Sequence, residues 1–453
     1  MKKIILFSFS LVLGVFAQNN TLESYVKLGL KNNLTLKQKR ISLQQSIAAL
    51  DEARGMFFPS LSINARYTRA GGGREIIFPV GDLFNPIYRT LNALTRSTQF
   101  PTNLSNQVIP FLREKEHDTK VSLILPIIQP ALFYNYGIKS DLTEIKKIEK
   151  NIYKRKLIAD IKIAYYNYLK SIKINKLFLS TIELVKENLR VSESLYKNDK
   201  VTIDVVYRAK AELSEIEQKQ LEAKRNAELA KSYFNFLLNK PLESEIEIFE
   251  DNNSIKNIPQ NDFEKRALLN REELSQIKLA VDVAKGTAGL AKSKYLPGLA
   301  LAVDYGFQGE KYKFTEDDDY WMASIVLSWN LFNGFQDKAK AEQAELEAKK
   351  IFTQLTEVKN QIRLQVKEAV KNYLVAEKTI NATNERLESF RKSYKIIKRK
   401  YAEGMASQIE YLDARNKLTQ AEVQAIIAQY DYKQKYAQLE QIVALVDLSK
   451  YEN

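Results

Sequence analysis

Apolar residues recur in alternating steps of four and three along the stretch 333–401, and no Gly or Pro interrupts it between Gly334 and Gly404. The apolar positions in its middle are Ile362, Val366, Ala369, Tyr373, Ala376 and Ile380. This heptad-like spacing predicts a continuous helix that packs along other helices. At about 1.5 Å per residue the helix is about 100 Å long, which is deeper than a globular core. We therefore expect an elongated assembly of helices.

Five further stretches carry a helical pattern. They are predicted over 131–196, 203–238, 409–446, 21–57 and 262–294. The second and third are shorter helices that follow the two long ones after a polar turn. The last two end at Pro59 and Pro297, because proline cannot continue a helix.

Four stretches alternate strictly between apolar and polar residues, which predicts strands with two different faces. They form two hairpins, 60–130 and 298–330. The first hairpin contains a long connection, 70–118, with a Gly71–Gly73 run and weak periodicity. We expect this connection to be an irregular extracellular loop, because loops of this size are ordinary on the outer end of a membrane hairpin.

The same order of elements occurs twice. A first repeat, 18–241, and a second repeat, 262–453, each read helix, strand, strand, long helix, turn, shorter helix. Tyr67 in the first repeat corresponds to Tyr305 in the second. The segment between them, 242–261, is a linker at the equator of the helices, with one short strand expected over 245–249.

The N-terminus predicts export. Lys2 and Lys3 precede an apolar run that ends at Phe16, and small residues follow at the usual cleavage spacing, so residues 1–17 are interpreted as a signal peptide. No later stretch has 18 consecutive apolar residues, and no transmembrane helix is expected. Export without cysteine suits the bacterial cell envelope.

The composition excludes several classes of binding and catalytic site. The formal charge is +14, but the basic excess is spread along helices such as 139–190, which favours a solvated or duct-lining face over a nucleic-acid patch. The chain has no cysteine and a single histidine, His117, which excludes a disulfide framework, a thiolate nucleophile and most zinc sites. No catalytic constellation is visible. We expect no enzyme activity, no cofactor and no nucleic-acid partner.

The strands indicate a membrane barrel with lipid outside and water inside. Aromatic residues Tyr67, Tyr305, Trp321 and Trp329 lie near strand ends, where they would anchor the barrel at the membrane interface. The alternatives are a soluble sheet with one buried face and ordinary core packing of the aromatic rings. Four strands cannot close a barrel in lipid, so the barrel would be shared between copies of the chain.

The helix lengths indicate a hollow cylinder. The helices 203–238 and 262–294 together are about as long as one long helix, and 409–446 with 21–57 give a similar sum. All are apolar along only part of their circumference, so they cannot fill a core of this length. The fold class predicted is mixed α and β: antiparallel coiled-coil helices in an α-barrel, plus four transmembrane β-strands per chain, with an internal repeat.

Several motifs carry a family resemblance. They are Phe58-Pro59-Ser60-Leu61, Leu296-Pro297-Gly298-Leu299, the run from Ser328 to Gly334, and Tyr401-Ala402-Glu403-Gly404 leading into Glu410-Tyr411-Leu412-Asp413-Ala414-Arg415. In their order and spacing the chain resembles the TolC-like outer-membrane efflux protein family over essentially its whole mature length.

The resemblance implies a homotrimer with a twelve-stranded barrel in outer-membrane lipid and a twelve-helix tunnel across the periplasm. It implies the exit duct of a tripartite efflux or type I secretion system. The expected partners are a periplasmic adaptor (membrane fusion) protein and an inner-membrane pump of the RND, ABC or MFS type. An elongated coiled-coil scaffold or adhesin without a pore is the alternative, but it needs no repeated two-faced strands.

The resemblance also implies roles at the two helix turns. Glu410 and Asp413 match the carboxylates that close the periplasmic entrance in the family, and the alternative is that they suit the N-terminal dipole of the last helix. The turn residues expected to contact the adaptor are Asp199, Thr202, Gly404 and Ser407. For the two hydroxyls the alternative is helix capping. The family often has a basic residue in the second turn, where this chain has Ala406.

Overall fold

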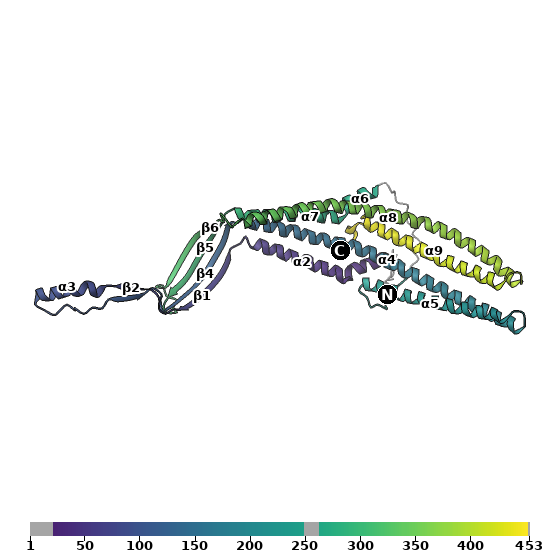
Figure 1. Ribbon diagram of the computed structural model, residues 1–453, viewed down its shortest axis with the longest axis horizontal. Coiled ribbons are helices and arrows are strands. Elements are labelled where there is room, and N and C mark those ends of the chain that lie inside the picture. Colours follow the sequence, from purple (N-terminus) through teal and green to yellow (C-terminus); the bar gives the residue numbers. More distant parts are fainter. Residues whose placement is uncertain (1–20, 249–261, 452–453) are drawn as a thin grey trace, which may run out of the picture. The chain divides into compact units, whose positions relative to one another are not determined.

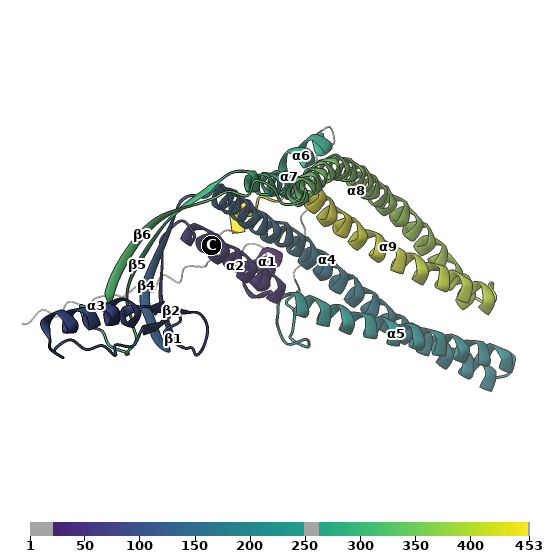
Figure 2. The same cartoon turned by 60° about the vertical axis from the view of Figure 1, so that its left-hand side comes forward.

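The computed structural model describes residues 21–248 and 262–451 (Figure 1). The predicted signal peptide and residues 249–261 of the linker lie outside these ranges. The four longest helices are α4 (Pro130–Lys197), α5 (Ile203–Leu237), α8 (Gln336–Ala402) and α9 (Gln408–Ile442). Helices α4 and α8 contain 68 and 67 residues, so each is about 100 Å long. Each turns back into a shorter helix, and the two hairpins are seen in Figures 1 and 2. Within the described ranges, every helix is too short or too polar to cross a membrane.

Two compact units divide the chain. Unit 1 holds the described residues up to Ile47, Asp141–Val283 and the residues from Glu347 onward. Unit 2 consists of Ala48–Ser140 and Ala284–Leu346. Unit 1 is helical, and unit 2 carries the strands. Each unit is therefore made of non-consecutive pieces of both repeats.

Unit 1 contains two large apolar clusters that repeat each other. Leu157, Ile161, Ala164 and Tyr168 of α4 are buried in the first cluster, and Ile362, Val366, Ala369 and Tyr373 of α8 are buried in the second. Each pair is 205 residues apart, as in 373 − 168. The internal repeat thus extends to the side chains that form the core.

The helices that lead into the strands are each broken once. The first consists of α1 (Thr21–Asn32) and α2 (Leu34–Gly55), and the second of α6 (Phe263–Asn270) and α7 (Glu272–Lys292), followed by the 3₁₀ turn η2 (Ser293–Tyr295). The prediction of uninterrupted helices over 21–57 and 262–294 is wrong at these joints.

Polar side chains explain the joints. The Oδ1 of Asn33 accepts from the N–H of Leu36, so that Asn33 caps α2, and its Nδ2 donates to the Leu237 carbonyl at 3.0 Å. At the equivalent joint Arg271 has extended backbone (φ −72°, ψ 124°) and donates to Glu273 and to Gln365. Tertiary partners thus decide both breaks.

Two basic residues of α4 are withdrawn from solvent: Lys154 is buried and Arg155 is half-buried. Lys154 Nζ donates to the carbonyls of Leu448 and Tyr451, at 3.2 and 3.0 Å, in the C-terminal segment that ends in η3 (Leu448–Tyr451). Arg155 binds the Glu272 carboxylate and the Val446 carbonyl. The expectation of a solvated or duct-lining basic face does not hold at these two residues, because the cations hold the C-terminal segment and the start of α7.

Unit 2 contains a four-stranded antiparallel sheet in the order β1-β4-β5-β6. Its strands are β1 (Ser60–Arg69), β4 (Lys115–Ile128), β5 (Gly298–Gly309) and β6 (Asp319–Ser328). The register places the apolar residues Leu61, Leu123, Val303 and Ala323 in one row across the sheet. Ser62, Ser122, Asp304 and Met322 form the neighbouring row, which faces the other side. The two faces predicted from alternation are confirmed.

The connection between β1 and β4 is ordered. It contains β2 (Glu75–Phe78), α3 (Val80–Thr95) and β3 (Gln107–Pro110), and β2 pairs with β3. The expectation of an irregular loop over 70–118 is wrong, because the Asn side chains of α3 bind the returning backbone: Asn85 and Asn92 bind Leu104 and Phe100.

The described part of the linker, 242–248, forms no strand. Ile246 is buried in the first helical cluster, and the N–H of Glu247 donates to the Tyr25 hydroxyl at 2.9 Å. Asn235 Nδ2 donates to the carbonyls of Leu242 and Ser244. These side-chain bonds replace the pairing that a strand would need, so the strand expected over 245–249 does not form in 245–248. Phe249 lies outside the described residues.

Candidate functional site

The turn between α4 and α5 is closed by backbone bonds. The N–H of Lys200 donates to the Leu195 carbonyl at 2.9 Å, and Asp199 has a left-handed φ of 55°. This is the Schellman geometry, in which glycine is usual and Asn or Asp is tolerated. Thr202 precedes α5 with extended backbone, but its hydroxyl donates to the Asp204 carboxylate and caps no backbone N–H.

The turn between α8 and α9 has the same backbone and a different cap. Gly404 has φ 73°, and the N–H of Met405 donates to the Lys400 carbonyl at 2.7 Å. Ser407 and Glu410 form a reciprocal capping box: the Ser407 hydroxyl accepts from the Glu410 N–H, and Glu410 accepts from the Ser407 N–H at 2.7 Å. The second turn is thus stabilised by side-chain hydrogen bonds as well as by backbone hydrogen bonds.

Two contacts tie these turns to each other. Gln408 Nε2 donates to the Val205 carbonyl at 2.8 Å, and Arg415 Nη2 binds Glu212 Oε1 at 2.5 Å. The side chains of Arg415 and Glu212 are only 3% and 6% exposed. Burial raises the pKa of Glu212 above its ordinary value, although Arg415 pulls in the opposite direction. The α4–α5 and α8–α9 hairpins are therefore joined near their tips by a buried ion pair.

Sequence reasoning missed this ion pair. Glu212 lies between the buried residues Ala209 and Ile216, and Arg415 follows the buried Ala414. A charge beside an apolar seam on each hairpin was a usable signal, because a buried charge needs an opposite one. The sequence could not say that the two seams face each other.

The predicted entrance carboxylates are both engaged within α9. Glu410 is exposed, and its bonds from the Ser407 N–H and hydroxyl lower its pKa. Asp413 accepts from Lys417 at 2.7 Å, one turn along the helix. Within one chain, therefore, these carboxylates cap and pair their own helix, and their role in an entrance stays a proposal.

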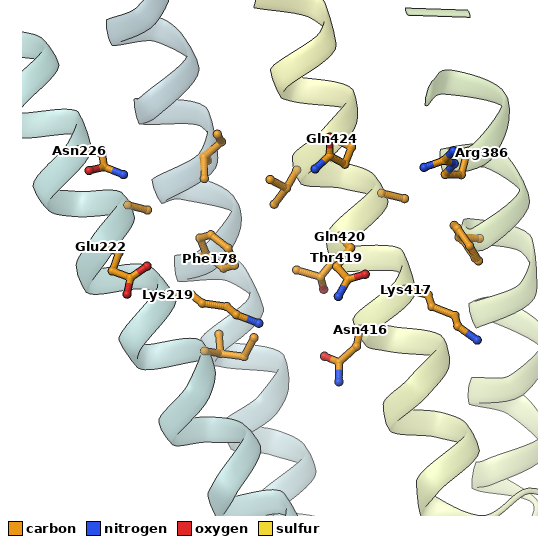
Figure 3. Close-up of a pocket in the computed structure, with 16 residues that line it drawn as sticks. Phe178, Lys219, Glu222, Asn226, Arg386, Asn416, Lys417, Thr419, Gln420 and Gln424 are labelled. Carbon is orange, nitrogen blue, oxygen red and sulfur yellow. The ribbon is translucent and has the colours of Figure 1, made fainter. Parts of the chain in front are cut away.

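A groove of about 810 Å³ lies between the two hairpins of unit 1 (Figure 3). Its lining includes Phe178 and Ile216, from α4 and α5. Polar residues of α5 and α9, including Lys219, Glu222 and Gln424, line its sides. An apolar lining between charged sides is suited to an elongated amphipathic segment.

The four predicted anchor residues are all exposed. Tyr67, Tyr305 and Trp321 are on the apolar face of the sheet, with Tyr305 directly opposite Trp321 in the register. Trp329 follows the other end of β6, and its indole N–H donates to the Tyr295 carbonyl at 3.0 Å. Aromatic residues are thus placed toward both ends of the strands, and none of the four is packed into a core of the described chain.

The polar face of the sheet carries its own network. Lys120 Nζ binds Asp304 Oδ2 at 2.6 Å, and the Tyr320 hydroxyl donates to Asp118 at 3.1 Å. On the apolar face Leu61 and Ile325 are 70% and 71% exposed. A soluble sheet would bury this face, so the alternative of a soluble sheet does not fit.

Comparison with known proteins supports the family resemblance. The model of the "Outer membrane efflux protein" family matches residues 265–445. Outer membrane protein TolC of Escherichia coli (strain K12) is 20% identical over 449 residues, which cover 95% of this chain and 84% of TolC. By these two matches the chain is similar to the TolC-like outer-membrane efflux proteins.

Solved structures of outer-membrane channels share its fold. The CmeC outer membrane channel of Campylobacter jejuni superposes with a TM-score of 0.79 at 18% identity, over 95% of this chain and 88% of CmeC. VceC of Vibrio cholerae gives 0.76 at 14% identity, over 93% and 95%. This TolC-like protein therefore has the fold of these outer-membrane channels, and the family and fold neighbours that it matches are channels rather than enzymes.

Proposed function

We propose that this TolC-like protein is the exit duct of a tripartite efflux or type I secretion system. In this proposal a homotrimer conducts substrates passively from an inner-membrane pump and a periplasmic adaptor to the outside. The observation that carries it is the two-faced sheet with open edges at β1 and β6. Unpaired edges are not tolerated in lipid, and three copies of four strands would close a barrel of twelve.

The helices support a duct rather than a rod. Each repeat supplies one helix of about 100 Å and a shorter helix beside it, with a matched apolar cluster in each. A coiled-coil scaffold or adhesin would need neither the sheet nor its exposed apolar face. That alternative is not favoured.

Planar bilayers test the duct directly. Purified protein should insert and give discrete conductance steps, either spontaneously or after the entrance is opened. A trimer that gives no pore under any condition would overturn the proposal. Light scattering on the detergent-solubilised protein shows whether the trimer exists.

We assign the entrance to the turns at the ends of α4 and α8. Repeated by threefold symmetry, Glu410 and Asp413 would form a ring of negative charge that favours cations. The variant Glu410→Gln with Asp413→Asn should reduce the cation preference measured from reversal potentials in a salt gradient. An unchanged preference would mean that these carboxylates serve only α9.

The tip residues Asp199, Thr202, Gly404 and Ser407 are proposed to contact the adaptor, and the groove beside Phe178 would accept one of its helices. Photo-cross-linkers placed at Thr202 and at Gln424 in cells should capture the adaptor. The identity of the captured adaptor would then indicate the pump type, whether RND, ABC or MFS. Capture of no envelope protein from either position would argue against an adaptor site there.

A further inference from the structure

The β1–β4 connection, defined as residues 70–114, exposes more apolar side chains than an ordinary loop. Leu83, Phe84, Ile87 and Leu94 lie along one stripe of α3, and Leu94 is 76% exposed. Ile76, Ile77, Phe78, Val108 and Ile109 are exposed on β2 and β3. An exposed apolar stripe such as that of α3 usually marks a contact.

The β2–β3 ribbon is apolar on both faces. Ile76 lies opposite Ile109, and the next pair, Ile77 opposite Val108, points to the other face because side chains alternate along a strand. A two-stranded ribbon by itself is only marginally stable in water. A lipid surface could cover one face of this ribbon, whereas copies of the chain on either side could cover both.

The apolar stripe of α3 is held in place by polar contacts elsewhere on the helix. The side chain of Asn92 donates to the Phe100 carbonyl at 2.8 Å and accepts from the Phe100 N–H at 3.0 Å. Asn85 makes the same two bonds to the backbone of Leu104, both at 2.8 Å. Tyr88 stacks on Phe100 with ring centres 5.7 Å apart. The returning chain thus binds α3 through Asn85 and Asn92. It leaves the apolar stripe, which includes Leu83, Ile87 and Leu94, exposed.

In the proposed homotrimer the connection begins at the border between copies. Its ribbon continues the β1–β4 pair through two backbone bonds, from the Ala70 N–H to Glu114 and from the Phe111 N–H to Arg74. Strand β1 is an edge of the sheet. In a closed barrel that edge pairs with β6 of the next copy. The ribbon therefore extends from the strand that forms the interface.

The composition of the connection is that of a protein interface. Residues 70–114 contain no lysine, although the chain is rich in basic residues, and they contain five aromatic residues and four arginines. Protein interfaces favour aromatic residues and arginine and are poor in lysine. Amphipathic helices that bind membranes carry lysine and arginine along their polar face, whereas α3 has Arg89 alone there.

We propose that the β1–β4 connection binds the same connection of neighbouring copies, through the stripe of α3 and both faces of the β2–β3 ribbon. The three connections then form an outer collar that is incomplete in any one chain. This proposal rests on the homotrimer of the proposed function.

A spin label tests what covers the stripe. The chain has no cysteine, so Leu94→Cys can be labelled alone in the full-length protein in lipid vesicles. We expect a strongly immobilised spectrum, with low accessibility to both oxygen and a water-soluble nickel chelate. Arg89→Cys, on the opposite side of α3, is the matched control and should be accessible to nickel. High oxygen accessibility at Leu94 would show lipid, and high nickel accessibility would show solvent; either result overturns the proposal.

A spin label could itself disturb the packing at Leu94, so an unlabelled variant provides a second test. Ile77→Asp with Leu94→Asp should lower the temperature at which the trimer dissociates, whereas Arg89→Asp should leave it unchanged. An equal temperature for both variants contradicts the collar. Light scattering distinguishes failure of the collar from failure of the proposed duct. Trimers with an accessible stripe refute only the collar, whereas monomers refute the duct itself.

Discussion

At the scale of single residues, the two helix turns share a backbone and differ in their caps. The left-handed positions Asp199 and Gly404 and the extended positions Thr202 and Ser407 are equivalent in the repeat. Only Ser407 uses its hydroxyl to accept from the following helix. The second turn is consequently the better fixed of the two, which matters if it borders an entrance.

Ser407→Ala removes the capping bond of α9. Because an N-cap is worth about 1 kcal/mol, amides 408–412 should exchange with solvent about five times faster. Hydrogen-exchange mass spectrometry measures this. Thr202→Ala is the matched control, since its hydroxyl caps no backbone N–H, and amides 203–207 should change much less. Equal acceleration at both turns would contradict the capping difference.

The buried pair Arg415–Glu212 calls for a double-variant test. In the described residues Arg415 Nη1 and Glu212 Oε2 have no further partner, so removal of one charge leaves the other buried alone. Arg415→Met should destabilise unit 1 by about 3–5 kcal/mol, and Glu212→Leu with Arg415→Met should recover most of that loss. Thermal unfolding of the three proteins measures it. A double variant that is no more stable than Arg415→Met would show that the pair does not act as a unit.

At the scale of elements, the close approach of β4 and β5 depends on one glycine. A Cβ on Gly306 would lie 2.6 Å from the Lys120 Cβ and 2.7 Å from the Thr119 carbonyl. Neither atom can move without its strand. The polar face of the sheet therefore tolerates no side chain at this position.

Gly306→Ala should separate the two strands and cost about 1–3 kcal/mol, as overpacking usually does. The expected result is a lower melting temperature of the β-sheet signal in circular dichroism and a lower yield of folded protein. Gly298→Ala, at the other end of β5, is the control, because its Cβ would meet nothing closer than 3.8 Å. Equal melting temperatures for the two variants would refute the packing argument.

At the scale of the whole molecule, buried tyrosines limit stability at high pH. Burial, assisted by hydrogen bonds to Tyr432 and Tyr394, raises the pKa of Tyr373 and Tyr411 well above the ordinary value. Burial also raises the pKa of Tyr436 to about 12. These phenols keep their protons in the folded protein at a pH where the unfolded chain releases them.

Stability should therefore be constant below about pH 10, the ordinary pKa of tyrosine, and fall as the pH rises through the raised values. Melting temperatures recorded between neutral pH and about pH 12 measure the fall. Replacing Tyr373 and Tyr411 by Phe removes two of the groups and should make the fall shallower. An unchanged slope in that variant would assign the alkaline loss to other residues.

The lengths and faces of the elements followed from the sequence because they depend on local spacing. The seam through Val366 and Tyr373 specified a helix of about 100 Å, and alternation around Val303 specified a two-faced strand. Both periods are properties of neighbouring residues. The repeat was also visible, because equivalent core positions keep their residue types.

Only the tertiary structure decided the features that join distant segments. Asn33 breaks a helix because Leu237 accepts its amide, Lys154 is buried because the C-terminal carbonyls reach it, and Arg415 meets Glu212 across two hairpins. The order in the β1–β4 connection likewise depends on Asn85 and Asn92 meeting a returning chain. Local periodicity shows which face of an element is apolar. Which polar group on another element will satisfy a buried one depends on where the fold brings the two together.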